Sequence, residues 1–196
     1  GRKRHPCRSQ AAPRPHVPGE PRLREKRVFR ISEPPRRRLT PSAALALVGF
    51  IGLCLLVGAA SAGAARGGIG PWYDALAKPP GTPPAMVFGP VWTVLYVSIG
   101  TAGWLVWRCG QYWPVRHLLR RWGWQLGLNA VWAPAFFGLH SPLLGLAVIL
   151  LLAAALGWTI AGFARLRPLA AWLLLPYAGW VAYAAYLDAG LCWLNR

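Results

Sequence analysis

The fold of this chain is decided by SAALALVGFIGLCLLVGAASAGAA, residues 42–65. This stretch of 24 residues contains no Asp, Glu, Lys or Arg. A helix rises about 1.5 Å per residue, so this one is long enough to cross a hydrocarbon core about 30 Å thick. A long apolar segment without charge is typical of a transmembrane helix, and the chain is therefore predicted to be an integral membrane protein.

Four more apolar stretches follow, at about residues 85–107, 118–139, 143–164 and 168–194. Each has about the length of a membrane span. The sequence thus predicts an all-α fold, an integral membrane bundle of five transmembrane helices in a domain of residues 41–196. The predicted localisation is multi-pass, in a bacterial cell membrane or, if the source is eukaryotic, in an organelle membrane.

Residues 1–40 belong to a different physical class. They hold 13 of the 22 Lys and Arg residues and seven prolines, with few large apolar side chains. Such a segment cannot bury enough surface to offset its ordering entropy, so we predict a disordered basic tail. The composition favours a tail held near anionic lipid headgroups. It leaves open a cleaved transit peptide and a nucleic-acid-binding arm, although the tail has no aromatic residue besides Phe29; no nucleic-acid partner is predicted for the chain.

The charged connections predict the orientation of the bundle. The tail, the connection between the second and third predicted helices and that between the fourth and fifth carry most of the basic side chains. Alternating spans place all three on one side of the membrane. The positive-inside rule then predicts an inside N-terminus and an outside C-terminus.

Three of the predicted helices combine large aromatic side chains with small or amide side chains on one face. Helical spacing groups Gln125, Asn129, Trp132 and Phe136; Trp92, Tyr96 and Gly103; and Trp180, Ala184, Leu187 and Asp188. Amides in hydrocarbon need partners, so these faces should point into the bundle. They either hold the helices together or line a slot for a planar apolar ligand.

Asp188 is the one acidic residue inside a predicted span. An intramembrane carboxyl is a candidate for function. Its position near the end of the last helix equally allows contact with interfacial water. The chain shows no hydrolytic triad, metal-ligand spacing or phosphate loop, so neither a metal site nor a cofactor is predicted.

Four motifs resemble the translocator protein family, also called the tryptophan-rich sensory protein or peripheral benzodiazepine receptor family. They are WYDALAKPPGTPP (72–84), FGPVWTVLY (88–96), QLGLNAVWAPAFFG (125–138) and PYAGWVAYAAYL (176–187). Together they cover about residues 41–195, in order and at family-like spacing. The resemblance implies a five-helix membrane bundle, commonly a homodimer in the lipid bilayer. It also implies binding of porphyrins and haem-pathway intermediates, sterols, or synthetic planar ligands.

The resemblance also implies the residues of the pocket. Trp92 and Trp180 correspond to pocket tryptophans that, in bacterial members, are implicated in light- and oxygen-dependent porphyrin breakdown. A ligand-binding role is implied or supported by the helical faces for Tyr73, Pro83, Trp92, Tyr96, Asn129, Trp132, Phe136, Trp180, Ala184 and Leu187. Tyr73 and the loop of residues 78–84 would form a lid. Whether the chain is an enzyme stays open, because no conventional catalytic group accompanies the tryptophans.

Three departures from the family pattern shape the functional hypothesis. The lid has Gly81 where an aromatic residue is usual, and Asp188 stands where the family usually has Asn. The sterol-recognition pattern of animal members is absent, since Ala189 and Trp193 occupy two of its positions. The favoured function is a membrane receptor or regulator for tetrapyrroles, with light-dependent porphyrin degradation as an open activity. The alternative is a transporter of porphyrin, sterol or another amphipathic molecule.

Overall fold

The computed structural model describes residues 40–66, 70–110 and 112–195, all of them helical or in turns and loops. The predicted basic tail lies outside this part of the chain, apart from Thr40. The elements are α1 (Pro41–Ala65), α2 (Pro71–Ala75), α3 (Ala85–Trp107), α4 (Trp113–Ala133), η1 (Pro134–Gly138), α5 (Pro142–Leu166) and α6 (Pro168–Leu194). The all-α prediction is therefore confirmed for the described residues, in which there is no strand.

Helix starts follow from local sequence. The side-chain oxygen of Thr40 accepts a bond from the backbone N–H of Ala43 at the start of α1, and Ser141 does the same for Leu144 at the start of α5. Proline stands at the first or second position of α1, α2, α4, η1, α5 and α6. Proline is favoured there because its missing N–H would have no helical partner in any case.

Two boundaries differ from the sequence-based expectation. The third long helix begins at Trp113, before the expected residue 118, because Pro114 can start a helix and the basic residues after it form the first turns of α4. At Pro134 the chain changes to the π-helical turn η1. The expected loop after α1 contains the short helix α2, which Pro71 starts.

Four helices are long and apolar enough to cross a membrane: α1, the Met86–Trp107 part of α3, α5 and α6. This agrees with a multi-pass integral membrane protein. The predicted count of five spans is not confirmed, because α4 does not meet the same criterion. Arg116, Arg120 and Arg121 occupy its first half, and Gln125 and Asn129 lower its hydropathy further.

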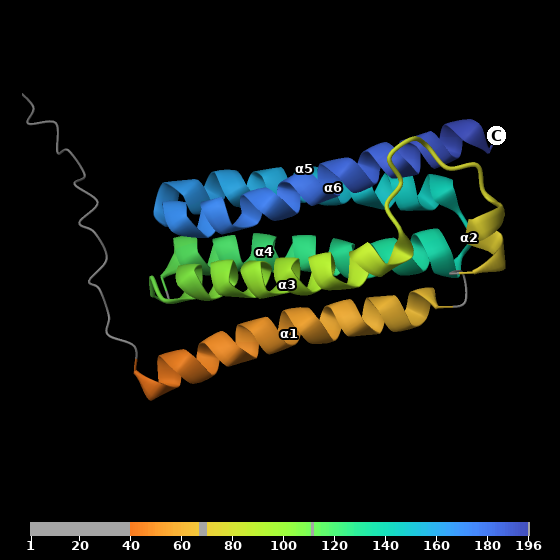
Figure 1. The fold of residues 1–196 in the computed structure, drawn as a ribbon. Coiled ribbons are helices and arrows are strands. Elements are labelled where there is room, and N and C mark those ends of the chain that lie inside the picture. The colour runs from red at the N-terminus through yellow and green to blue at the C-terminus, as the bar shows by residue number, and fades with distance from the viewer. Residues whose placement is uncertain (1–39, 67–69, 111, 196) are drawn as a thin grey trace, which may run out of the picture. The chain divides into compact units, whose positions relative to one another are not determined.

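The long helices pack side by side, as Figure 1 shows. α5 contacts α6 and α4, whereas α1 lies against α3 and α4. α2 lies at the end of the bundle where α6 ends (Figure 1). At Gly100 the α3 backbone comes so close to α1 that a Cβ atom would lie 2.8 Å from the Cα of Ile51. This close crossing fixes α1 against α3 near Ile51. The next two turns of α1, from Leu55 to Ala62, contribute to the lining of a cavity.

Trp122 stands near the start of the span expected at about residues 118–139, where tryptophan rings often lie at the membrane interface. Instead it is buried, and its Nε1 donates to the backbone oxygen of Ile99 at 3.0 Å. Gly103 on α3 makes the room, since a Cβ atom there would lie 2.8 Å from the Trp122 ring. Trp113, Trp172 and Trp193 are exposed, as interfacial rings would be.

Candidate ligand-binding site

A buried amide joins three helices at the centre of the bundle. The Oδ1 atom of Asn129 on α4 accepts a hydrogen bond from the hydroxyl group of Tyr96 on α3 at 2.6 Å. Its Nδ2 atom donates to the hydroxyl oxygen of Tyr177 on α6 at 3.0 Å. All three residues are buried. Asn129 is therefore a structural junction whose polar atoms are already bonded within the protein.

One turn earlier on the same face, Gln125 presents the opposite case. The residue is 0 % exposed, and neither its Nε2 nor its Oε1 atom has a hydrogen-bond partner among the described residues. An unpaired buried amide costs about 1–3 kcal/mol. The shared face of α4 thus contains one amide that holds helices together and one that has no bonded neighbour.

A large cavity lies beside this junction. It has a volume of about 550 Å³, within the range of small-molecule sites. One wall is α1, where small side chains predominate, and the other walls are rings and small residues of α3 and α4. The lining residues are Leu55, Gly58, Ala59, Ser61, Ala62, Phe88, Gly89, Trp92, Thr93, Tyr96, Asn129, Trp132 and Ala133. A flat wall facing several rings suits a planar apolar ligand.

The polar side chains of the large cavity bond to the protein itself. The Ser61 hydroxyl donates to the backbone oxygen of Ala130 at 2.9 Å, and the Thr93 hydroxyl donates to that of Gly89. The amide of Asn129 is bonded to Tyr96 and Tyr177. Since these donors already have acceptors, the cavity chiefly offers apolar and aromatic surface.

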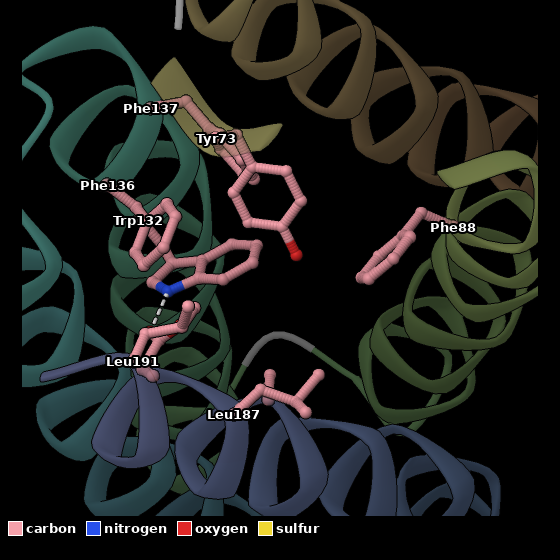
Figure 2. A pocket seen from close by; sticks show the side chains of 9 residues that line it. Tyr73, Phe88, Trp132, Phe136, Phe137, Leu187 and Leu191 are labelled. Atoms are coloured by element: carbon pink, nitrogen blue, oxygen red, sulfur yellow. Dashed lines mark hydrogen bonds between the residues drawn. The ribbon is translucent and has the colours of Figure 1, made fainter. Parts of the chain in front are cut away.

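A second, smaller cavity shares Trp132 and Phe88 with the large one. Its volume is about 20 Å³, the room for about one water molecule. Its lining residues are Tyr73, Phe88, Trp132, Phe136, Phe137, Ala184, Leu187, Asp188 and Leu191. Figure 2 shows the hydroxyl group of Tyr73 pointing into the space between Trp132, Phe88 and Leu187.

Asp188 belongs to this smaller cavity rather than to an exposed helix end. It is 3 % exposed, and its Oδ2 atom accepts a hydrogen bond from Trp132 Nε1 at 2.8 Å. Of the two interpretations that the sequence allowed, the structure favours the buried carboxyl. Trp132 and Phe88 border both cavities.

The short helix α2 and the loop after it close one end of the site. The ring of Tyr73 lies against Phe137, with 5.4 Å between centroids. The loop is bonded to α6, because the hydroxyl groups of Tyr183 and Tyr186 donate to the backbone oxygens of Gly81 and Pro80. Asn195 also bonds both backbone groups of Ala77. The expected lid is thus tied to the last helix at several points.

Partial burial raises the pKa of Tyr73 above its ordinary value, and the negative carboxyls of Asp188 and Asp74 and the hydroxyl group of Tyr183 add to this rise. The Nζ atom of Lys78 lies 4.8 Å from the centroid of the Tyr73 ring. Tyr73 is therefore neutral at ordinary pH, when its hydroxyl can donate a hydrogen bond.

The structure divides the predicted site residues between the two cavities, and two of them line neither. Trp92, Tyr96 and Asn129 line the large cavity; Tyr73, Phe136, Ala184 and Leu187 line the small one; and Trp132 lines both. Trp180 lines neither. Its ring contacts Phe88 with 5.8 Å between centroids, and its buried Nε1 has no acceptor among the described residues. Pro83 lies in the loop before α3 and also lines neither cavity.

Several lining residues were not singled out from the sequence. The wall on α1 was missed, although Gly58 and Ala62 are small residues four positions apart, a spacing that often marks close helix packing. Phe88 and Phe137 stand within two of the family-like motifs, but the sequence pattern did not mark them as pocket residues. Among the described residues there is no group of three or more His, Cys, Asp or Glu that could hold a metal ion.

Fold and cavities together define a multi-pass helical membrane protein with aromatic cavities between its helices. Comparison with known families then places it further. The model of the TspO/MBR family matches residues 50–194, and the chain belongs to this family.

Individual relatives agree with this assignment. The chain is 39% identical over 154 residues to Tryptophan-rich protein TspO of Chlorobaculum tepidum, and the aligned segment covers 77% of the chain and 96% of the relative. It is 38% identical over 119 residues to Translocator protein of Homo sapiens, and this alignment covers 60% of the chain and 70% of the relative. Protein CrtK of Rhodobacter capsulatus is 34% identical over 127 residues, 64% of the chain and 79% of the relative.

Proposed function

We propose that this protein is a membrane receptor or regulator that binds tetrapyrroles and related planar apolar ligands between α1, α3 and α4. The observation that carries the proposal is the cavity of about 550 Å³ with a flat wall of small residues opposite the rings of Trp92, Tyr96 and Trp132. A planar ligand would stack on these rings and displace little protein. Each stacked aromatic pair contributes about 0.5–1.5 kcal/mol beyond the buried area.

Titration with protoporphyrin tests this proposal. Twelve tryptophans make the intrinsic fluorescence a direct reporter, and quenching should saturate at one ligand per chain. Replacing Ala59 by Trp places an indole in the flat wall of the cavity and should weaken binding more than tenfold. Replacing Leu56, an exposed residue of the same helix that lines neither cavity, by Trp is the matched control. Equal affinity of both variants would contradict the proposed location.

Light-dependent porphyrin degradation is the open activity of the same site. Trp92 lines the large cavity, whereas Trp180 does not and only contacts its lining residue Phe88, so of these two tryptophans Trp92 is the one that can touch a ligand there without rearrangement. We expect Trp92→Phe to slow porphyrin loss under illumination sharply and Trp180→Phe to slow it less. Trp158→Phe, on an exposed position of α5 outside both cavities, serves as the control. If the parent protein loses porphyrin no faster than free porphyrin in detergent, the chain is a binding protein only.

Transport of an amphipathic molecule is the second candidate. The large cavity is bounded by α1 and α3, two of the helices that can cross a membrane, so a ligand dissolved in lipid could reach it without passing through water. Uptake of porphyrin into proteoliposomes measures this directly. Saturable uptake that Ala59→Trp abolishes would favour transport over simple binding.

We further propose that α4 and η1 form a fifth span and that the chain works as a homodimer in the bilayer. The 21 residues of α4 extend about 30 Å, and α4 packs along both α1 and α5. Its arginines are confined to its first half, where they can reach headgroups. Reporter fusions after Arg108 and Arg167 should report the inside, and fusions after Lys78 and at the C-terminus the outside. Light scattering in detergent tests the dimer.

A further inference from the structure

The small cavity holds one acidic side chain in a wall that is otherwise apolar or aromatic. Asp188 accepts one hydrogen bond there, from Trp132. A carboxylate offers about four acceptor positions, so this bond uses only part of its capacity. A carboxyl group buried at membrane depth is costly unless it is paired, and a ligand group that donates to it would therefore gain binding energy.

The surroundings of Asp188 suit a nitrogen that is positively charged or donates N–H. Aromatic residues from three parts of the chain line the same cavity: Tyr73, Phe88, Trp132, Phe136 and Phe137. Aromatic faces attract cations and repel anions. The volume of about 20 Å³ accommodates an ammonium or N–H group and excludes a ring system.

The charges around the small cavity do not favour an anion. Among the residues that the structure describes, none of those lining the small cavity is basic. Lys78 is exposed and lies over the Tyr73 ring, and its Nζ atom donates to the backbone oxygen of Asp74 at 3.2 Å. A ligand carboxylate placed beside Asp188 would therefore meet a like charge in a low-dielectric environment, which is strongly unfavourable.

We propose that Asp188 binds a basic or N–H-donating nitrogen of the planar ligand, whose ring system occupies the large cavity. This inference rests on the proposed function and specifies its ligand class. Trp132 and Phe88 border both cavities, so a short substituent on a ring stacked in the large cavity would enter the small one beside these side chains. Any carboxylate of the ligand points away from Asp188. Trp132 positions the carboxyl through its bond to Oδ2 and leaves Oδ1 for the ligand.

The proton balance of this contact is simple. If Asp188 is protonated before binding, it gives its proton to a neutral basic nitrogen, or to water when the nitrogen is already protonated; if it is ionised, the nitrogen arrives protonated. Either way the complex holds one proton between the carboxyl oxygen and the nitrogen. No bond other than a bond to a proton forms or breaks.

Three fluorescent probes of equal ring size test the proposal: 1-pyrenemethylamine, 1-pyrenemethanol and 1-pyrenecarboxylate. Their affinities are measured for the full chain in an uncharged detergent. We expect the amine to bind at least tenfold more tightly than the carboxylate. The formal charge of the chain, +17, attracts the carboxylate non-specifically, so a preference for the amine must come from a local acidic group.

Asp188→Asn keeps an oxygen for the Trp132 bond, so the variant should fold. It should weaken amine binding about tenfold and leave pyrenemethanol unchanged. Asp74→Asn makes the same chemical change at the other acidic residue of residues 41–196, which is exposed on α2 and lines neither cavity. This control should leave all three affinities unchanged.

The outcomes separate this inference from the proposed function. Tight binding of pyrenemethanol with equal affinities for amine and carboxylate would overturn the role of Asp188 and keep the planar-ligand function. If Asp188→Asn weakens the affinity for all three probes equally, Asp188 has a structural role only, which also overturns the proposal. Binding of none of the probes by the parent protein would overturn both.

Discussion

Two amides on one face of α4 should respond in opposite directions to apolar replacement. Asn129 bonds Tyr96 and Tyr177, whereas Gln125, one turn earlier, has no partner among the described residues. Both are almost fully buried, at 2 % and 0 % exposed. They therefore share the same helix, the same face and the same environment, and differ mainly in hydrogen bonding.

The structure gives the expected magnitudes. Asn129→Leu keeps a similar shape but loses two hydrogen bonds, each worth about 0.6–1.7 kcal/mol between membrane helices, so about 1–3 kcal/mol in all. The better helix propensity of Leu offsets at most about 0.7 kcal/mol of this loss. Gln125→Met keeps the length of the side chain and removes an unpaired amide, and should raise the free energy of unfolding by about 1–3 kcal/mol.

The assay is reversible unfolding in mixed micelles with an increasing fraction of sodium dodecyl sulfate, followed by far-ultraviolet circular dichroism. Adding Tyr177→Phe to Asn129→Leu should recover part of the lost stability, because it removes a hydroxyl group that would otherwise be buried without a partner. The reasoning is refuted if Gln125→Met destabilises the bundle by more than about 1 kcal/mol. It is also refuted if Asn129→Leu changes nothing.

Three further predictions address the large cavity, the lid and the tail. A Cβ atom at Gly58 would collide with the Tyr96 ring, so Gly58→Ala should cost about 1–3 kcal/mol in the same unfolding assay, whereas Gly52→Ala, with nothing within 4 Å, should be neutral. Because the pKa of Tyr73 is raised, ionising its phenol costs more in the folded than in the unfolded protein. The corresponding stability is fully present below about pH 10 and is lost as the pH rises through the folded-state pKa. Thermal unfolding of Tyr73→Phe should lack this alkaline loss. Deleting residues 1–38 removes basic charge but none of the packed helices, so porphyrin affinity should stay within tenfold, about 1.4 kcal/mol, and a larger loss would place the tail at the site.

Much of the helical framework could be predicted because its signals are local. Apolar length marked α1, α3, α5 and α6, and helical spacing placed Asn129, Trp132 and Phe136 on one face, which is buried. α4 was harder to delimit. Its charged first half is not typical of a transmembrane span. The π-helical turn η1, which begins at Pro134, contacts α1 and α5, and such contacts between distant segments leave no local signal in the sequence.

The cavities could not be derived in the same way. Periodicity tells which residues share a face of one helix, but a cavity is the volume that the side chains of several helices fail to fill. The wall formed by Gly58 and Ala59 on α1 only becomes meaningful once α1 is known to face Trp92 and Tyr96. Trp180 is the opposite case. Its motif and its helical face correctly indicated contact with the aromatic cluster, yet it lines neither cavity and contacts Phe88, which lines both.

Trp132 makes the two cavities depend on each other. Its ring lines both, and its N–H bonds Asp188 in the small cavity. A ligand that moves the ring in the large cavity must stretch or break the bond to Asp188, and a ligand that pairs with Asp188 changes the group that holds the ring. Occupancy of one cavity is therefore coupled to the other in both directions, as linkage requires. A loss of ligand affinity in a Trp132 variant consequently cannot be assigned to either cavity alone, whereas Gly58 and Asp188 each line only one.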